Sequence, residues 1–243
     1  MDLFGTTLYM TSLGVFLYKY VYLPLMAVLL ALLYRLLLRR VRPTAMKWSL
    51  LAMLAVGLTL LPWWDVYRTG SQVTELCRNE GGLHVYRTVE ADGFLGASSI
   101  EYWSRYGFKY VEGGGTGNRK FRATIRDGQA VDEEVPEYIS RYQWKGKENH
   151  VPIAPLIERS SSHVIDRQSG GELGTLVWFT IGKGWFDRLA MGFLPGEANP
   201  WICGWDAPPQ QGQYWEAKKK WVYSSDDLIK GTIQPLSHKD SDR

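Results

Sequence analysis

The residues best suited to nucleophilic chemistry stand together in one short segment, whose sequence is "SSSHVID". It places Ser160, Ser161 and Ser162 beside His163 and Asp166, so a nucleophile, a base and an acid occur within seven residues. A hydrolase triad, however, is normally assembled from separate elements, and neighbouring side chains on one strand point to opposite faces. The pattern therefore favours a structural role for this segment, and we expect no catalytic residue in it.

Metal and phosphate sites find little support in the residue spacing. A metal site needs several ligands close together in the sequence, but the four histidines occur singly, as His84, His150, His163 and His238. The glycine-rich segment at residues 113–120, "GGGTGNRK", fits neither of the common phosphate-loop patterns. It is better interpreted as a connection between strands. We therefore expect no metal ion and no cofactor.

The two cysteines, Cys77 and Cys203, are 126 positions apart. An even number of cysteines in an oxidising compartment is the usual sign of a disulfide, and the topology argued below places both of them in such a compartment. Closing so long a loop would stabilise the fold by at most about 5 kcal/mol in the chain-entropy model. We predict this disulfide, with two unrelated buried thiols as the alternative.

Aromatic residues are concentrated near the C-terminus, where six of the eleven tryptophans lie within 44 residues. Prolines and glycines interrupt this region and favour loops, and rigid aromatic side chains on loops are common anchors in interfaces. Packing in the core of a small domain is the main alternative for the same residues. We predict that residues 185–214 carry a binding surface formed by Trp185, Phe186, Phe193, Trp201, Trp205 and Tyr214.

Two apolar runs lie near the N-terminus, at residues 21–38 and 48–64. The first has 18 residues and a single charge, Arg35, and at about 1.5 Å per residue a helix of this length approaches the thickness of a bilayer core. The second run has no charge and ends in Trp63 and Trp64, which suit the membrane interface. We therefore predict two transmembrane helices, which form a membrane anchor at residues 1–64.

The loop between these runs, residues 39–47, is basic and contains no acidic residue. Short loops rich in Lys and Arg stay on the cytoplasmic side of a membrane. We therefore expect a multi-pass protein of the inner (plasma) membrane with both termini on the extracytoplasmic side. The residues that determine this topology are Arg35, Arg39, Arg40, Arg42 and Lys47.

The remainder of the chain is not basic. Six of the 28 basic residues and one of the 25 acidic residues precede Asp65, which leaves 22 basic and 24 acidic residues from Asp65 onward. A nucleic-acid partner would need a clustered basic surface there, so we expect none.

Residues 65–233 have the pattern of an extracytoplasmic α+β domain with a mainly antiparallel sheet and one or two short helices. Ser71 and Ser99 are candidate helix N-caps, and the helix after Ser99 should end near Gly107. A turn at Asp127-Gly128 and a hairpin with its turn at residues 168–171 are the clearest strand signals. Residues 234–243 have the composition of a disordered tail.

These patterns predict a membrane-anchored envelope protein whose extracytoplasmic domain binds a protein or glycan partner without catalysis, and homo-oligomers are possible. The alternative is an envelope hydrolase or transferase that uses carboxylate acid/base chemistry. For that alternative the unranked candidates are Glu80, Glu101 and Asp187.

Overall fold

The computed structural model describes residues 2–3, 6–7, 10–36, 44–115, 119–193, 201–203 and 223–236 of this α+β chain. Its contacts divide it into two compact units. The first unit consists of residues 1–76, 154–157 and 180–201, and the second of residues 77–153, 158–179 and 202–243. The predicted boundary between residues 64 and 65 therefore falls inside the first unit.

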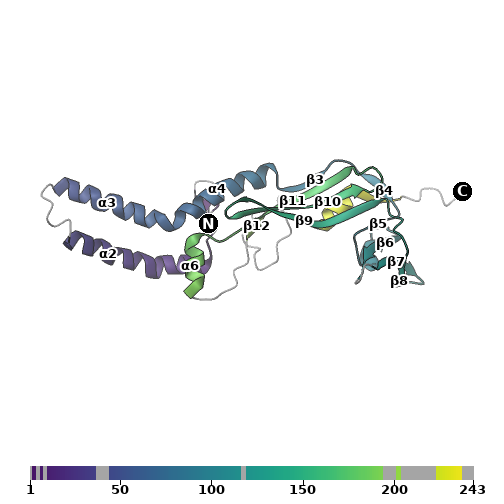
Figure 1. Ribbon diagram of the computed structural model, residues 1–243, viewed down its shortest axis with the longest axis horizontal. Coiled ribbons are helices and arrows are strands. Elements are labelled where there is room, and N and C mark those ends of the chain that lie inside the picture. The colour runs from purple at the N-terminus through teal and green to yellow at the C-terminus, as the bar shows by residue number, and fades with distance from the viewer. Residues whose placement is uncertain are drawn as a thin grey trace. The chain divides into compact units, whose positions relative to one another are not determined.

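Two long apolar helical segments dominate the first unit (Figure 1). One comprises α1 (Ser12–Leu17), the π-helical turn η1 (Tyr18–Tyr22) and α2 (Leu23–Leu36), after two short paired strands, β1 (Asp2–Leu3) and β2 (Thr6–Thr7). The other begins with α3 (Thr44–Leu60) and continues through the 3-10 turn η3 (Leu61–Trp63) into α4 (Trp64–Asn79). By length and composition, both segments can cross a membrane.

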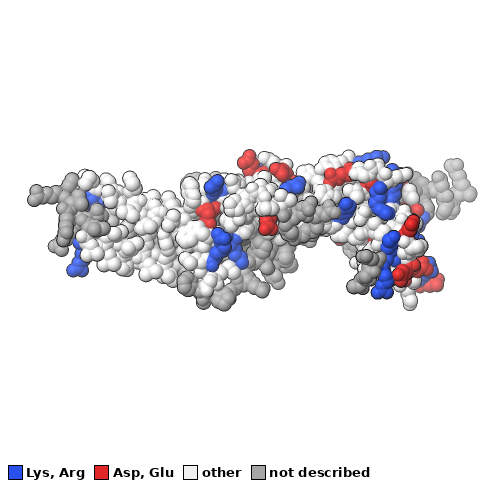
Figure 2. Space-filling view, viewed as in Figure 1, with Lys and Arg blue, Asp and Glu red and all other residues white. Residues whose placement is uncertain are grey.

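The apolar side chains of these segments are largely exposed, as Leu25 at 63% and Met53 at 76% illustrate. On the face shown in Figure 2, Lys, Arg, Asp and Glu are sparse over α2 and α3. Arg35 is exposed near the end of α2, and Lys47 lies in the first turn of α3. The other three predicted topology determinants, Arg39, Arg40 and Arg42, lie outside the described residues.

The predicted N-cap at Ser71 is wrong, because α4 already begins at Trp64 and Ser71 lies in its interior. No helix-breaking residue separates the apolar run from this helix, since Pro62 occupies the start of a 3-10 turn, where proline is tolerated. The buried side chains of α4 follow a helical spacing at Val66, Val73 and Cys77.

The main sheet has nine strands. Eight follow the order β12-β11-β10-β9-β5-β6-β7-β8, and β3 pairs antiparallel with residues 174–177 of β11 outside this order. The sheet is mostly antiparallel, but β5 runs parallel to both β6 and β9. The strand bounds are β3 (Gly82–Val85), β5 (Gly93–Leu95), β6 (Tyr110–Gly114), β7 (Lys120–Arg126), β8 (Gln129–Glu134), β9 (Tyr142–Ala154), β10 (Ile157–Asp166), β11 (Glu172–Ile181) and β12 (Trp201–Cys203).

The local turns agree with the sequence patterns. Asp127 and Gly128 both have positive φ and join β7 to β8, whereas Gly170 has a φ of 71° in the turn between β10 and β11. Ser99 caps the short helix α5 (Ile100–Ser104), and Gly107 follows it with a φ of 95°.

The C-terminal part forms α8 (Ser225–Thr232) and then β13 (Ile233–Pro235), which pairs in parallel with β4 (Val89–Ala91). The predicted disordered tail therefore starts too early, because Gln234 and Pro235 belong to a strand. Residues 237–243 lie outside the described residues.

A disulfide links Cys77 of α4 to Cys203 of β12, with the two Cα atoms 6.1 Å apart, and both residues are buried. The core of the second unit contains an aromatic cluster: the ring centroids of Phe94 and Trp103 lie 5.0 Å apart, and those of Phe94 and Phe108 lie 5.2 Å apart, both edge to face. Such arrangements favour a single rigid packing of the rings.

Candidate functional site

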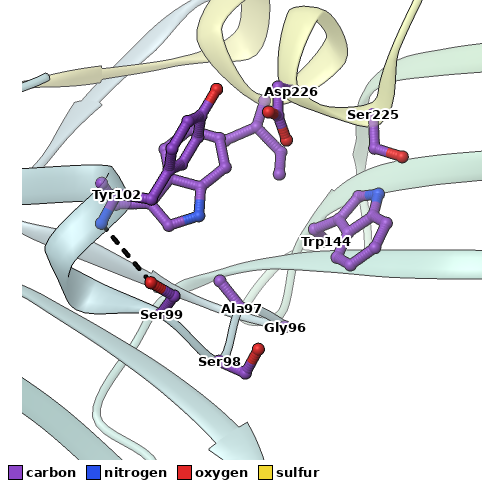
Figure 3. A pocket seen from close by; sticks show the side chains of 10 residues that line it. Gly96, Ala97, Ser98, Ser99, Tyr102, Trp144, Ser225 and Asp226 are labelled. Atoms are coloured by element: carbon purple, nitrogen blue, oxygen red, sulfur yellow. Dashed lines mark hydrogen bonds between the residues drawn. The ribbon is translucent and has the colours of Figure 1, made fainter. Parts of the chain in front are cut away.

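The second unit contains a cavity of about 260 Å³ that four segments of the chain build together (Figure 3). The segments are the connection from β5 to α5, the helix α5, the strand β9 and the start of α8. In Figure 3, Tyr102 and Trp144 stand on opposite sides, with Ala97 and Ser98 below them and Asp226 and Ser225 above. Gly96, Ser99, Trp103 and Ile229 complete the lining.

The pairing of β5 with β9 brings the first wall into place. Leu95 is in register with Gln143, so the next residues, Gly96 and Trp144, are neighbours. Gly96 has a φ of 118°, and a Cβ there would collide with the carbonyl oxygen of Trp144. Only glycine allows this close approach, and it lets the chain turn away from the sheet towards Ser98 and Ser99.

Two short helices begin at the cavity. Ser99 accepts a hydrogen bond from the backbone N–H of Tyr102 at 3.4 Å, which Figure 3 marks with a dashed line. Ser224 and Asp227 form a reciprocal capping box at the start of α8. These caps hold the lining residues Tyr102 and Asp226 on regular helices, so the cavity walls are positioned before any ligand binds.

The aromatic residues of the cavity differ in exposure. Trp103 is only 5% exposed and packs edge to face against Tyr102, with 5.1 Å between the ring centroids. Trp144 is half-buried, and its indole Nε1 is buried without a hydrogen-bond partner among the residues that the structure describes. A buried indole N–H without a partner costs free energy, and because this atom has almost no accessible surface, a molecule in the cavity would contact the ring of Trp144 and not its N–H.

Tyr102 connects the charged groups at the rim. A hydrogen bond with Asp226 is the largest influence on its hydroxyl and, with Tyr106 and burial, raises the pKa of Tyr102 to about 12. Lys230 donates to the Tyr102 hydroxyl at 3.2 Å, and its Nζ lies 3.9 Å from the ring centroid of Tyr106. Tyr102 is therefore a neutral phenol between the carboxylate of Asp226 and the ammonium group of Lys230.

The predicted surface at residues 185–214 is only partly described. Trp185 and Phe186 lie on an α-helix, α6 (Trp185–Phe193), and not on a loop as expected. Phe186 is 6% exposed, and its ring centroid lies 5.6 Å from that of Tyr22, so this residue packs inside the first unit. Phe193 ends α6 and Trp201 begins β12, whereas Trp205 and Tyr214 lie outside the described residues.

The three candidate carboxylates each have a local partner. Asp187 accepts hydrogen bonds from the backbone and hydroxyl of Thr11, and burial raises its pKa. Glu101 accepts from Ser99 at 3.0 Å, and Glu80 lies 3.8 Å from Arg159. The contacts of the described residues bring no two of these carboxylates together.

The segment "SSSHVID" does form a hydrogen-bonded chain, although not the one considered from the sequence. Asp166 pairs with Arg141 at 2.7 Å. His163 instead contacts Glu172 of the next strand at 2.5 Å through Nδ1, and its Nε2 lies 2.8 Å from the Ser161 hydroxyl. Ser161 is only 4% exposed, so a substrate carbonyl could reach its hydroxyl only if covering side chains moved.

Sequence reasoning missed the cavity because its walls come from residues 96–103, 144 and 225–229, which no local pattern connects. The only local signals were the Ser99 cap and the glycine at position 96. In the described part of the chain, no group of three or more His, Cys, Asp or Glu residues could hold a metal ion.

No protein-family model, curated protein or solved structure matches the chain. The fold and the cavity must therefore be interpreted from their own residues. They define a mixed α+β chain with two long apolar helical segments and a preformed, aromatic-lined cavity in its second unit.

Proposed function

We propose that this chain is an integral membrane protein whose α+β part lies on the extracytoplasmic side and binds a protein or glycan partner without catalysis. The observation that supports binding best is the cavity between Tyr102 and Trp144. Concave sites with aromatic walls and a few polar groups are the usual form of a binding site. The cavity is built from capped helices and paired strands, so binding would cost little ordering of the protein.

The two apolar helical segments support the membrane anchor. Helices whose apolar side chains remain exposed need a hydrocarbon environment, or a partner, to cover them. The segments also contact each other: Tyr22 donates to the carbonyl oxygen of Leu58 at 2.7 Å, and Tyr18 donates to that of Thr59 at 3.1 Å. These bonds satisfy phenolic hydroxyls that lipid could not.

A second cavity, of about 370 Å³, lies between the first of these segments and α6. Its lining includes Leu17, Val21, Leu25, Phe186 and Leu189. In a bilayer, lipid chains or a neighbouring helix would fill such an apolar space, so we assign it to the anchor and not to ligand recognition.

The proposed topology places the basic loop in the cytoplasm and both termini outside, in the inner (plasma) membrane. The imbalance of Lys and Arg around the two spans supports it. The disulfide between Cys77 and Cys203 is compatible with it, since disulfides persist in oxidising compartments.

A second candidate function, an envelope hydrolase or transferase, draws on the Ser161–His163–Glu172 chain, which has the order of hydrogen bonds found in serine hydrolases. The low exposure of Ser161 argues against it. We therefore rank binding first, and test the nucleophile separately below.

The binding proposal is tested by cross-linking the full chain in the membranes of its own cells, purifying it and identifying what remains attached. We expect a protein or glycan partner to be recovered with the wild type, and recovery to fall with Trp144→Ala. Tyr86→Ala is the matched control, because Tyr86 is a 61% exposed aromatic residue of the second unit that does not line the cavity. Failure to recover any partner would overturn the proposal.

A further inference from the structure

We infer that the cavity between Tyr102 and Trp144 receives a positively charged side chain, Lys or Arg, of a protein partner. This inference rests on the proposed binding function and decides between its two kinds of partner. It follows from three properties of the lining: its one charged residue is acidic, its indole presents a ring face, and its serine hydroxyls can accept hydrogen bonds.

Asp226 gives the cavity its charge. Of the ten residues that line the cavity, it is the only charged one. Its hydrogen-bond partner Tyr102 is a neutral phenol, so the bond orients the carboxylate and leaves its negative charge in place. Figure 3 shows Asp226 above the space between Tyr102 and Trp144. A cation in the cavity would therefore meet a carboxylate and no basic lining residue.

The two helices that begin at the cavity reinforce this negative charge. Their first turns carry three carboxylates, Glu101 in α5 and Asp226 and Asp227 in α8, against one basic residue within the two helices, Lys230. The partial positive charge of each helix start is thus already met by acidic side chains. An anionic group, including the phosphate of a lipid, would be repelled by Asp226.

Lys230 lies beside the cavity and does not line it. It donates to the hydroxyl of Tyr102 at 3.2 Å, and its Nζ is 3.9 Å from the ring centroid of Tyr106, which is also outside the lining. The chain thus already holds one ammonium group against tyrosine rings at this place. A second cation in the cavity has Asp226 and the ring of Trp144 to itself.

The indole of Trp144 forms the wall opposite Tyr102 (Figure 3). Its N–H is buried, so a group in the cavity contacts the ring. Of the aromatic side chains, tryptophan attracts a cation over its ring most strongly, and the guanidinium of arginine also stacks on such a ring. An uncharged apolar group would gain contact area from the ring but nothing from the carboxylate.

The remaining lining fits the end of one such side chain. The ammonium of lysine has three hydrogen-bond donors and the guanidinium of arginine has five, and the hydroxyl oxygens of Ser98 and Ser225 can accept beside Asp226. At about 260 Å³ the cavity is slightly smaller than the roughly 300–1,000 Å³ of sites that enclose drug-sized molecules. It therefore suits a single side chain better than a folded peptide segment.

The test uses the full chain in micelles of dodecyl maltoside, whose head group is uncharged and neither attracts nor replaces a cation. The probes are glycine pentapeptides with blocked ends and a central Lys, Arg, norleucine or Glu, observed by saturation-transfer NMR with protein-free micelles as the blank. Choline and glucosamine represent cations that do not come from a protein. We expect saturation of the side-chain protons of the Lys or the Arg peptide, and none for the norleucine and Glu peptides.

Two variants locate the binding. Asp226→Asn keeps an acceptor for Tyr102 and removes the charge, so we expect the affinity for the Lys or Arg peptide to fall at least about tenfold, as for the loss of a charged hydrogen bond. Ser98→Trp fills the cavity from an exposed lining position and should abolish binding. The matched control is Asp132→Asn, which removes an exposed carboxylate of β8 outside the lining and should bind like the wild type.

The inference is wrong if neither the Lys nor the Arg peptide binds, or if the norleucine or Glu peptide binds equally well. It is also wrong if choline or glucosamine binds in place of the peptides, or if Asp226→Asn and Ser98→Trp leave peptide binding unchanged.

The partner recovery described above separates this failure from that of the proposed function. If a partner is recovered equally with the wild type, Asp226→Asn and Ser98→Trp, and no cationic peptide binds, the cation site is excluded and the binding function stands. If neither a peptide nor a partner binds, both proposals fail.

Discussion

Glu112 is the clearest case of a buried charge that its surroundings stabilise. Its side chain is fully buried, and it accepts hydrogen bonds from the Nη2 of Arg122 at 2.8 Å and from the backbone N–H of Ser140 at 2.8 Å. Burial alone would raise the pKa of Glu112, but the hydrogen bonds from Ser140 and Arg122 outweigh it and hold the pKa below its ordinary value of 4.5.

We therefore predict that Glu112→Gln lowers the free energy of unfolding by about 3 kcal/mol at pH 7, because it leaves Arg122 without its partner and turns an amide N–H towards backbone donors. Since the pKa of Glu112 is lower in the folded state, its stabilisation is complete above pH 4.5 and is lost as the pH falls below that value. The difference between variant and wild type should shrink accordingly in denaturant titrations of the full chain at decreasing pH.

The matched control is Glu133→Gln, which breaks an exposed pair with Arg126 on the neighbouring strands β7 and β8. We expect a change of less than about 1 kcal/mol there, since exposed ion pairs contribute little. Equal effects of the two substitutions would contradict the role assigned to burial.

Ser161 provides a second test at this scale. A fluorophosphonate probe labels a serine only if its hydroxyl is both activated and accessible. Because Ser161 is 4% exposed, we predict no labelling of the full chain, with a known serine hydrolase in the same sample as positive control. Labelling that disappears in Ser161→Ala would instead establish the hydrolase.

Among the elements, α4 and β12 are joined by the disulfide between Cys77 and Cys203. We predict that the denatured, unreduced protein takes up no maleimide and that the reduced protein takes up two labels per chain. Cys203→Ser should lower the free energy of unfolding by about 2–5 kcal/mol, the usual effect of removing a native disulfide. Two labels before reduction would show that the bond is absent in the cell.

The helix α6 explains why Trp185 and Phe186 are not loop anchors. The carboxylate of Asp65 accepts a hydrogen bond from the backbone N–H of Trp185 at 2.6 Å, which satisfies one of the free donors at the helix start. Asp187, two residues further along in the same first turn, is held by Thr11. Both contacts join residues more than a hundred positions apart, so no local pattern could have predicted this helix.

For the whole molecule, the central prediction is its orientation in the membrane. The basic loop should stay on the cytoplasmic side, which places the C-terminus on the other side of the membrane. A phosphatase reporter fused after Arg243 should therefore be active in a bacterial host, and a reporter that fluoresces only in the cytoplasm should stay dark. Neutral residues in place of Arg39, Arg40 and Arg42 should give a mixture of orientations. The opposite reporter pattern in the wild type would exclude the proposed localisation.

Some features of this protein depend on neighbouring residues alone, and the sequence was enough to predict them. The two apolar runs, the turn at Asp127-Gly128 and the Ser99 cap each follow from composition or from residues within a few positions of one another. The disulfide between Cys77 and Cys203 could be predicted for a different reason, because the chain has only two cysteines to pair.

The cavity, the burial of Phe186 and the contact of His163 with Glu172 were decided by the tertiary structure. The cavity exists because β5 lies between β6 and β9, which puts Gly96 beside Trp144, and because α8 returns to the same place from the far end of the chain. Strand order of this kind depends on which distant surfaces bury best together, and that free energy is not encoded in any short stretch of sequence.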